Sequence, residues 1–198
     1  MKNQAKSHLY LRWLVESAIM VAIATVLNEY TKIIPMPLGG GVTICSMLPL
    51  VLISFRFGWQ KGLVTAGVFS VLQLMFGMDN VAYATSAAMT AGIVLLDYIV
   101  PYTVIGLAGI FKKGKLEVRY ILGIVVTFAL RLACHFITGW WIWDALWPNE
   151  FGMVAPVYSL VYNGAYMLGE MVLSGVVAVL LCKTALRKYM AGEDLAAV

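Results

Sequence analysis

Long stretches without a charged side chain alternate with short polar connections along this chain. Residues 17–28, 62–78, 80–96, 98–111, 151–169 and 171–182 contain no Asp, Glu, Lys or Arg. A membrane-spanning helix needs about 20 predominantly apolar residues, so 198 residues have room for about six of them. The pattern therefore predicts an all-α integral membrane protein, a single transmembrane domain over 1–198 with helices at 9–28, 46–57, 62–77, 86–111, 119–143 and 155–185.

Composition favours the same class of protein. Hydrophobic residues make up 62% of the chain and charged residues 12%, whereas a soluble domain carries about 25% charged residues. The three cysteines stand at unrelated spacings without a Cys-x-x-Cys pair, so we interpret them as packing residues and expect neither a metal site nor a cofactor.

The positions of the cations predict an orientation in the membrane. A six-helix arrangement leaves Lys32 alone on one side and Arg131 inside a helix, and it brings every other Lys and Arg to the opposite side. Five or seven helices would scatter these cations over both sides. Because basic loops stay in the cytoplasm, we expect both termini there and the protein in the plasma membrane. The net charge of +4 then reflects topology, and no nucleic-acid partner is expected.

Five ionisable residues fall inside the expected helices, where a charge costs about 3 kcal/mol or more and usually faces the bundle interior. Glu16 lies near the cytoplasmic end of the first helix, from which it can reach the headgroups. Arg131 and His135 are four residues apart and share one helix face. Arg131 could form a structural ion pair with Asp97 or Glu170. For Asp97 and His135 we favour a ligand site.

The surroundings of Asp97 and His135 support that preference. Aromatic faces and a buried carboxylate attract an organic cation, and the Asn163 amide and the imidazole add directional hydrogen bonds. A membrane-surface belt explains Trp147 but not its polar neighbours. The pattern predicts an outward-facing pocket for a small, flat, cationic ligand. The aromatic residues concerned are Phe136, Trp140, Trp141, Trp143, Trp147, Phe151, Tyr158, Tyr162 and Tyr166.

Enzymatic function finds no support in the motifs. Ser159 has no His or acid nearby in the sequence, and the chain contains no Gly-x-Ser-x-Gly and no Walker A motif. The protein is therefore not expected to be an enzyme, and active uptake would need a partner or an ion gradient as its energy source.

Several segments, in order, are similar to one known family. They are ESAI at 16–19, LPL at 48–50, SFRFG at 54–58, KGL at 61–63, LDY at 96–98, GLAG at 106–109, HFITG at 135–139 with Trp143 following, and YSLVYNG at 158–164. Through these segments, nearly the whole chain resembles the thiamine-specific S component (ThiT family) of energy-coupling factor (ECF) transporters.

The resemblance implies a six-helix S-component fold that binds extracellular thiamine and then docks on a transmembrane coupling protein and two ATPases. It implies that Trp143 stacks on the ligand and that Tyr158 and Asn163 bind its pyrimidine. Asp97 supplies the carboxylate, with Tyr98 and His135 beside it. An S component for another vitamin or organic cation remains an alternative, as does, from another class, a membrane enzyme or a stand-alone channel.

Two further regions carry expectations from the resemblance. Relatives have a Trp lid in the first loop, but this chain has no Trp between Trp13 and Trp59, so Tyr30 is a candidate substitute. Tyr83, before the fourth helix, is a further candidate for the ligand site. The small residues Ala18 and Ala22 allow a close helix contact, either inside the bundle or, as the resemblance implies, with the coupling protein.

Overall fold

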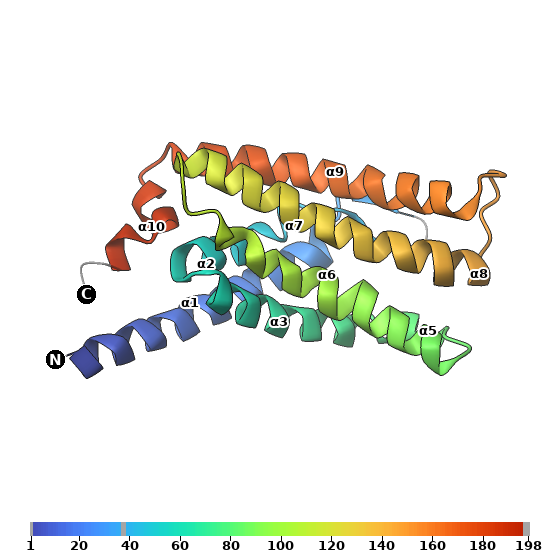
Figure 1. The fold of residues 1–198 in the computed structure, drawn as a ribbon, viewed down its shortest axis with the longest axis horizontal. Helices are drawn as coiled ribbons and strands as arrows, with labels where there is room; N and C mark the ends of the chain where they lie inside the picture. Colours follow the sequence, from blue (N-terminus) through green and yellow to red (C-terminus); the bar gives the residue numbers. More distant parts are fainter. Residues whose placement is uncertain (1, 37–38, 196–198) are drawn as a thin grey trace.

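The computed structural model describes residues 2–36 and 39–195, and most of them are helical (Figure 1). The long or central helices are α1 (Lys2–Tyr30), α2 (Leu48–Phe57), α3 (Trp59–Phe76), α7 (Leu116–Thr138) and α9 (Ala155–Cys182). The remaining helical segments are α4 (Met78–Ala82), α5 (Ala87–Gly92), η1 (Ile93–Ile99), α6 (Val100–Thr103), η2 (Val104–Ile110), η3 (Gly139–Trp143), α8 (Asp144–Leu146), α10 (Arg187–Ala191) and η4 (Glu193–Leu195).

Four helices of the described chain are long and apolar enough to cross a membrane. They are Lys6–Tyr30, Ala87–Ile110, Leu116–Leu146 and Ala155–Cys182. The prediction of a helical membrane protein is confirmed, but these criteria do not reach the expected six spans. The two expected spans that do not meet these criteria are α2 and α3. With 10 residues, α2 rises about 15 Å, which is half the thickness of a hydrocarbon core.

The short helix α2 lies inside the bundle rather than on its surface. It contacts α1, α3, α7, α10 and η2, and eight of its ten residues are buried. Pro49 fits its first turn, where a backbone N–H would have no partner. Gly58, with φ of +92°, then turns the chain sharply into α3.

The fourth expected helix is continuous but departs from α-helical winding in two segments, the π-helical η1 and the 3-10 helix η2. It begins at Ser86, whose hydroxyl accepts from the Met89 amide (3.2 Å), and η1 is a π-helical turn. Pro101 lies four residues after Asp97, so it offers no N–H to the Asp97 carbonyl and its ring crowds that oxygen. The wider π turn accommodates this crowding.

Close contact between backbones explains the 3-10 segment η2 that follows. A Cβ at Gly106 would lie 2.4 Å from the Gly62 carbonyl carbon, so only glycine fits between α3 and η2. Ser54 of α2 donates its hydroxyl to the Gly106 carbonyl (2.5 Å) and accepts from the Gly109 amide (2.8 Å). These side-chain bonds satisfy backbone groups that the tighter helix leaves free.

The connection between α1 and α2 contains a small antiparallel hairpin. Its strands are β1 (Ile34–Pro35) and β2 (Gly41–Val42), with Ile34 opposite Val42. We call residues 33–36 and 39–42 the hairpin. Val42 packs against Tyr166 and Met167 of α9, so the hairpin lies against that helix.

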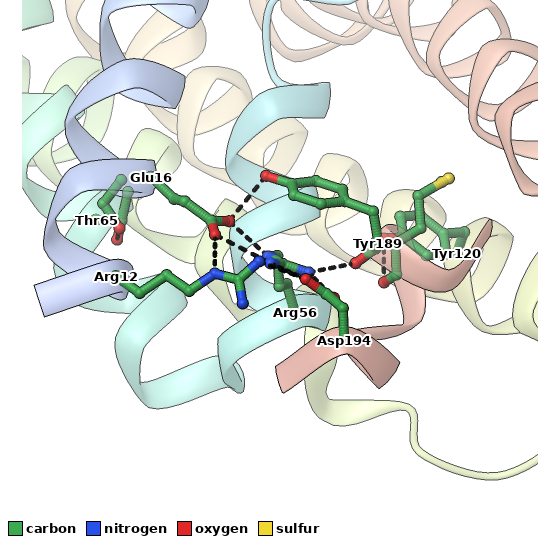
Figure 2. Close-up of polar contacts among 9 residues, drawn as sticks. Arg12, Glu16, Arg56, Thr65, Tyr120, Tyr189 and Asp194 are labelled. Carbon is green, nitrogen blue, oxygen red and sulfur yellow. Dashed lines mark hydrogen bonds and ion pairs between the residues drawn. The ribbon is translucent and has the colours of Figure 1, made fainter. Parts of the chain in front are cut away.

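The start of α1 and the short helix α10 lie at one end of the bundle, and α5 and α8 lie at the other (Figure 1). We call the former the terminal end. A polar network fastens the chain there, and Figure 2 shows Arg56 at its centre. The buried Arg56 guanidinium donates to Glu16 (2.5 and 3.0 Å), to Asp194 (2.5 and 2.8 Å) and to the Tyr189 carbonyl (2.9 Å).

This network gives Glu16 partners that the sequence did not predict. Its carboxylate accepts from Arg12 (2.8 Å), Arg56 and the Tyr189 hydroxyl (2.9 Å). Arg12 also donates to Asp194. Hydrogen bonds from Arg56 hold the pKa of the Asp194 carboxyl at about 2, and burial raises the pKa of Tyr189 to about 12. The network joins α1, α2 and the C-terminal segment.

Candidate ligand-binding site

A cavity of about 370 Å³ opens among α4, η1, α7, η3, α8, α9 and the hairpin. Its volume suits a small organic molecule. The segments that form it lie toward the end of the bundle that carries α5 and α8 (Figure 1). Its lining comprises Gly39, Gly40, Asn80, Tyr83, Asp97, Tyr98, Tyr102, Arg131, His135, Thr138, Gly139, Trp143, Asp144, Trp147, Tyr158, Ser159, Tyr162, Asn163 and Tyr166.

The Asp97 carboxylate is the most densely bonded acid of this cavity. Its Oδ2 accepts from the Trp143 indole Nε1 (2.7 Å). Its Oδ1 accepts from the Thr138 hydroxyl and lies 3.1 Å from His135 Nδ1. All three partners come from the continuous helix α7–η3. The side chain is nearly buried, so the site holds an anionic group away from bulk water.

His135 keeps one ring nitrogen unused. Its Nδ1 faces Asp97, whereas its buried Nε2 has no hydrogen-bond partner among the described residues. A buried polar atom without a partner is costly, because it has lost its water and gained nothing in return. Such an atom at a cavity wall is available to a ligand.

Two π-helical segments face each other across the site. Asp97 and Tyr98 belong to η1, and Trp143 ends η3. A π turn inserts one residue into a helix and re-aims the side chains that follow it. Tyr98 points toward α4, where it accepts from Asn80 (2.7 Å) and donates to the Gly77 carbonyl (3.2 Å). A Cβ at Gly77 would lie 2.0 Å from the Tyr98 hydroxyl, so any larger residue there would displace the Tyr98 side chain.

Aromatic rings form the walls around the carboxylate. Trp143 and Trp147 are stacked with centroids 5.8 Å apart, and Tyr83 meets Trp147 edge-on at 4.8 Å. On α9, the rings of Tyr158 and Tyr162 lie 5.8 Å apart. An anion surrounded by π faces favours a flat cation.

Asn163 joins α9 to α7 beside the cavity. Its amide nitrogen donates to the Ser159 carbonyl (2.9 Å) and the His135 carbonyl (3.3 Å), and its oxygen accepts from the Tyr166 hydroxyl (3.0 Å). Ser159 donates to the Phe136 carbonyl (2.8 Å), and Gly139 permits the close approach of the two helices. These bonds hold the back wall of the cavity.

Comparison with known proteins identifies the family. The family model described as thiamine transporter protein (Thia_YuaJ) matches residues 14–190. The thiamine transporter ThiT of Bacillus subtilis (strain 168) is 35% identical over 197 residues, which cover 93% of this chain and 96% of that protein. The chain belongs to the thiamine transporter family.

A solved structure of ThiT from Listeria monocytogenes has the same fold. The two structures align with a TM-score of 0.70 over 91% of this chain and 98% of the other, at 24% sequence identity. As a member of the thiamine transporter family, the chain is a membrane-embedded transport protein and not an enzyme, as the sequence predicts.

Seven of the eight ligand-site candidates of this family member line the cavity: Tyr83, Asp97, Tyr98, His135, Trp143, Tyr158 and Asn163. Tyr30 does not. It ends α1 with 83% of its surface exposed, and Gly39 and Gly40 of the hairpin line the cavity instead.

Several lining residues were missed by sequence reasoning. Thr138, one turn after His135, carried a signal, because a hydroxyl on that helix face can reach an acid that the imidazole also reaches. Trp147 was assigned to the membrane-surface belt, yet it lines the cavity. Gly39, Asn80 and Tyr102 carry no local sequence signal.

The buried cation Arg131 pairs with Glu170 rather than with Asp97. Its Nη1 lies 3.2 Å from Glu170 Oε2, and its guanidinium lies over the Tyr102 ring at 4.9 Å. Both partners of the pair are nearly buried, and Arg131 also lines the cavity. Of the two ion pairs expected for Arg131, the one with Glu170 forms.

The small residues Ala18 and Ala22 are exposed on α1, next to the exposed Ile19 and Ile23. Their methyl groups therefore do not pack inside this chain, which removes the alternative of an internal helix contact. The face is open to lipid or to another protein.

Proposed function

We propose that this protein is the thiamine-binding S subunit of an ECF transporter, which captures extracellular thiamine and delivers it to the cytoplasm. The observation that carries this function is the Asp97 carboxylate within an aromatic cavity of about 370 Å³. Thiamine joins a flat thiazolium cation to an aminopyrimidine, so it needs an anion, stacking surfaces and hydrogen-bonding groups. Membership in the thiamine transporter family supports the same ligand.

The proposed roles of the site residues follow their chemistry and the family resemblance. Asp97 neutralises the thiazolium charge, and Trp143 stacks on the ligand rings. Tyr158 and Asn163 bind the pyrimidine, and the free His135 Nε2 is a further polar contact. Tyr98 and Tyr83 complete the walls on the opposite side.

The proposed partners are a transmembrane coupling protein and two ATPases. The need for them is supported by the absence of a Walker A motif from the chain. The open face of α1 around Ala18 and Ala22 is the proposed surface for the coupling protein, because small residues allow helices to approach closely.

The proposed topology has six spans, with both termini in the cytoplasm of the plasma membrane. It is supported by the distribution of Lys and Arg, which the positive-inside rule interprets. In this topology α2 and α3 cross as a pair, with the short α2 enclosed by its neighbours. A cysteine introduced at Lys113 would react with an impermeant maleimide only in inside-out vesicles, and one at Asn149 only in right-side-out vesicles.

Titration of the purified protein with thiamine tests the function directly. Stacking on Trp143 should quench tryptophan fluorescence in a saturable way, and calorimetry should give the same affinity. A stronger response to another vitamin or organic cation would identify a different ligand. Thiamine uptake by liposomes should require the coupling protein and ATPases, and uptake without them would indicate a stand-alone carrier or channel.

A further inference from the structure

A buried polar cluster lies beside the cavity, between α9, α7 and the chain that leaves the hairpin. It consists of Glu170 in the middle of α9, Arg131 of α7, and Thr43 and Ser46, which follow β2. All four are at most 5% exposed. A carboxylate in this layer is costly unless its oxygens are bonded and its charge is paired.

Both carboxylate oxygens of Glu170 accept hydrogen bonds. The partners of Oε1 both come from the segment that follows the hairpin. The hydroxyls of Thr43 and Ser46 each donate to Oε1 at 2.6 Å. Oε2 accepts from Arg131 Nη1 at 3.2 Å. Glu170 therefore connects a fixed residue of the helical bundle to the base of the hairpin.

The other end of the hairpin reaches the cavity. Gly39 and Gly40, which directly precede β2 and which we call the tip, are part of the cavity lining. The Gly39 carbonyl accepts from the Tyr162 hydroxyl (3.0 Å), and Gly40 packs so closely on Tyr166 that a Cβ would lie 3.0 Å from the ring. The tip thus covers the α9 side of the cavity.

The hydrogen bonds that Thr43 and Ser46 make at the base of the hairpin are buried, whereas the bond at its tip is exposed. The Tyr162 to Gly39 bond is exposed to solvent, but the bonds to Glu170 are enclosed. Water competes for exposed hydrogen bonds and not for enclosed ones, and bonds to a charged acceptor are the stronger class. The base therefore determines where the hairpin stays.

We propose that Glu170 is a positioning residue for ligand retention, which anchors the hairpin through Thr43 and Ser46 and so keeps the hairpin tip over the cavity. Arg131 supplies the counter-charge. The part of the inference that concerns thiamine rests on the proposed function, and the anchoring itself does not. A cluster that only held helices together would leave the hairpin unaffected when the two hydroxyls are removed.

The chain contains a natural reporter of hairpin opening. Lys32 is exposed and is the only Lys or Arg between Arg12 and Arg56. The amide of the next residue, Ile33, donates to the Val42 carbonyl (2.8 Å) within the hairpin. Trypsin binds its substrate in an extended form, so this hydrogen bond must break before the peptide bond after Lys32 can be cleaved. The cleavage rate therefore measures how often the hairpin opens.

The variant Thr43→Val with Ser46→Ala removes both hydroxyl donors and keeps the shape of the cluster. Thr127→Val is the matched control, because it removes an equally buried hydroxyl that bonds only to the carbonyls of its own helix α7. Without ligand, cleavage after Lys32 should be about tenfold faster in the double variant than in the control. Equal rates in two folded proteins would overturn the proposal.

Ligand release gives the second measurement. Stopped-flow tryptophan fluorescence should show about tenfold faster thiamine dissociation from the double variant, because a loosened tip no longer covers the cavity. Thr43→Ser, which keeps a hydroxyl, should retain the wild-type rate. If neither the dissociation rate of thiamine nor the cleavage rate after Lys32 changes, the proposal that Glu170 anchors the hairpin is wrong.

Two outcomes separate the anchor from the proposed function. If the wild-type protein does not bind thiamine, the proposed function fails, and cleavage after Lys32 still decides about the anchor. If the double variant does not fold, Ser46→Ala alone tests the proposal. Trypsin should then cleave Ser46→Ala after Lys32 faster than it cleaves Thr127→Val. Equal cleavage rates would contradict the proposal.

Discussion

The Trp143 indole nitrogen donates to Asp97 Oδ2 at 2.7 Å. This bond joins the two π-helical segments, η1 and η3, across the cavity. It fixes the plane of the indole before any ligand arrives, because a ring tied at its Nε1 cannot rotate freely. The proposed stacking surface is thus ordered in advance, which would lower the entropic cost of binding.

Replacing Asp97 by Asn should abolish high-affinity thiamine binding. The amide keeps the size of the side chain but removes the negative charge that a thiazolium needs, a loss of about 100-fold or more in affinity. Fluorescence titration of the folded variant measures it. Asp144→Asn is the control, since Asp144 lines the same cavity with only a long bond to Asn149 (3.4 Å). Equal affinities of the two variants would exclude Asp97 as counter-ion.

Trp143→Phe separates stacking from orientation. The phenyl ring retains an aromatic face but cannot donate to Asp97, so affinity should fall about tenfold and ligand-induced quenching should shrink. Trp141→Phe should change neither, because Trp141 is half exposed on the outer surface of η3. Quenching that persists in the Trp143 variant would assign the signal to another tryptophan.

Thr138→Val tests the support of the carboxylate. The substitution preserves the shape of this fully buried side chain and deletes the hydroxyl that donates to Asp97 Oδ1. A loosely held carboxylate should bind thiamine about five- to tenfold more weakly, as calorimetry would show. Thr138→Ser should restore binding. A valine variant with wild-type affinity would mean that Asp97 is held well enough by its other partners.

The polar network around Arg56 and Asp194 should make the stability of the protein depend on pH in the acid range. The pKa of Asp194 is held at about 2, below its ordinary value of 3.8. A lowered carboxyl pKa stabilises the fold above the ordinary value, and this contribution disappears as the pH falls through the lowered one. The melting temperature of the wild type should therefore exceed that of Asp194→Asn near pH 5, and the gap should close toward pH 2. A constant gap would contradict this linkage.

Enlarging the small residues of α1 should uncouple transport from binding. Ala22→Trp adds bulk to an exposed face, so the cavity should still bind thiamine with unchanged affinity. Uptake by liposomes with the coupling protein and ATPases should fall severely, because the helices can no longer approach closely. Val172→Trp on the exposed surface of α9 is the control. Equal uptake by both variants would remove α1 as the docking surface.

The long apolar helices were predictable because hydropathy alone distinguishes a segment that can remain in lipid from one that cannot. Asp97 and His135 were recognisable for the complementary reason, since ionisable groups in such segments need a specific use. The closeness of His135 and Asp97, 38 positions apart, was suggested by their polar and aromatic surroundings and by the family resemblance, which implies that both belong to one ligand site.

Other parts depend on tertiary contacts and were not predictable. The 3-10 segment at Gly106 lies in close backbone contact with Gly62, which is 44 positions away in the sequence. The hairpin tip replaces the expected Tyr30 because chain path, and not residue type, brings Gly40 to the cavity. The partner of Arg131 could be narrowed to two acids, and only the packing of α7 on α9 selects Glu170.

The network around Arg56 has a consequence for biogenesis. Arg56 enters the bundle on α2, early in synthesis, but one of its two carboxylate partners is Asp194, which the ribosome adds 138 residues later. Among the described residues, Glu16 is the other acidic partner of this buried cation and is made before it. The network around Arg56 is therefore completed only after the chain has been synthesised as far as Asp194, long after α2 itself has been made.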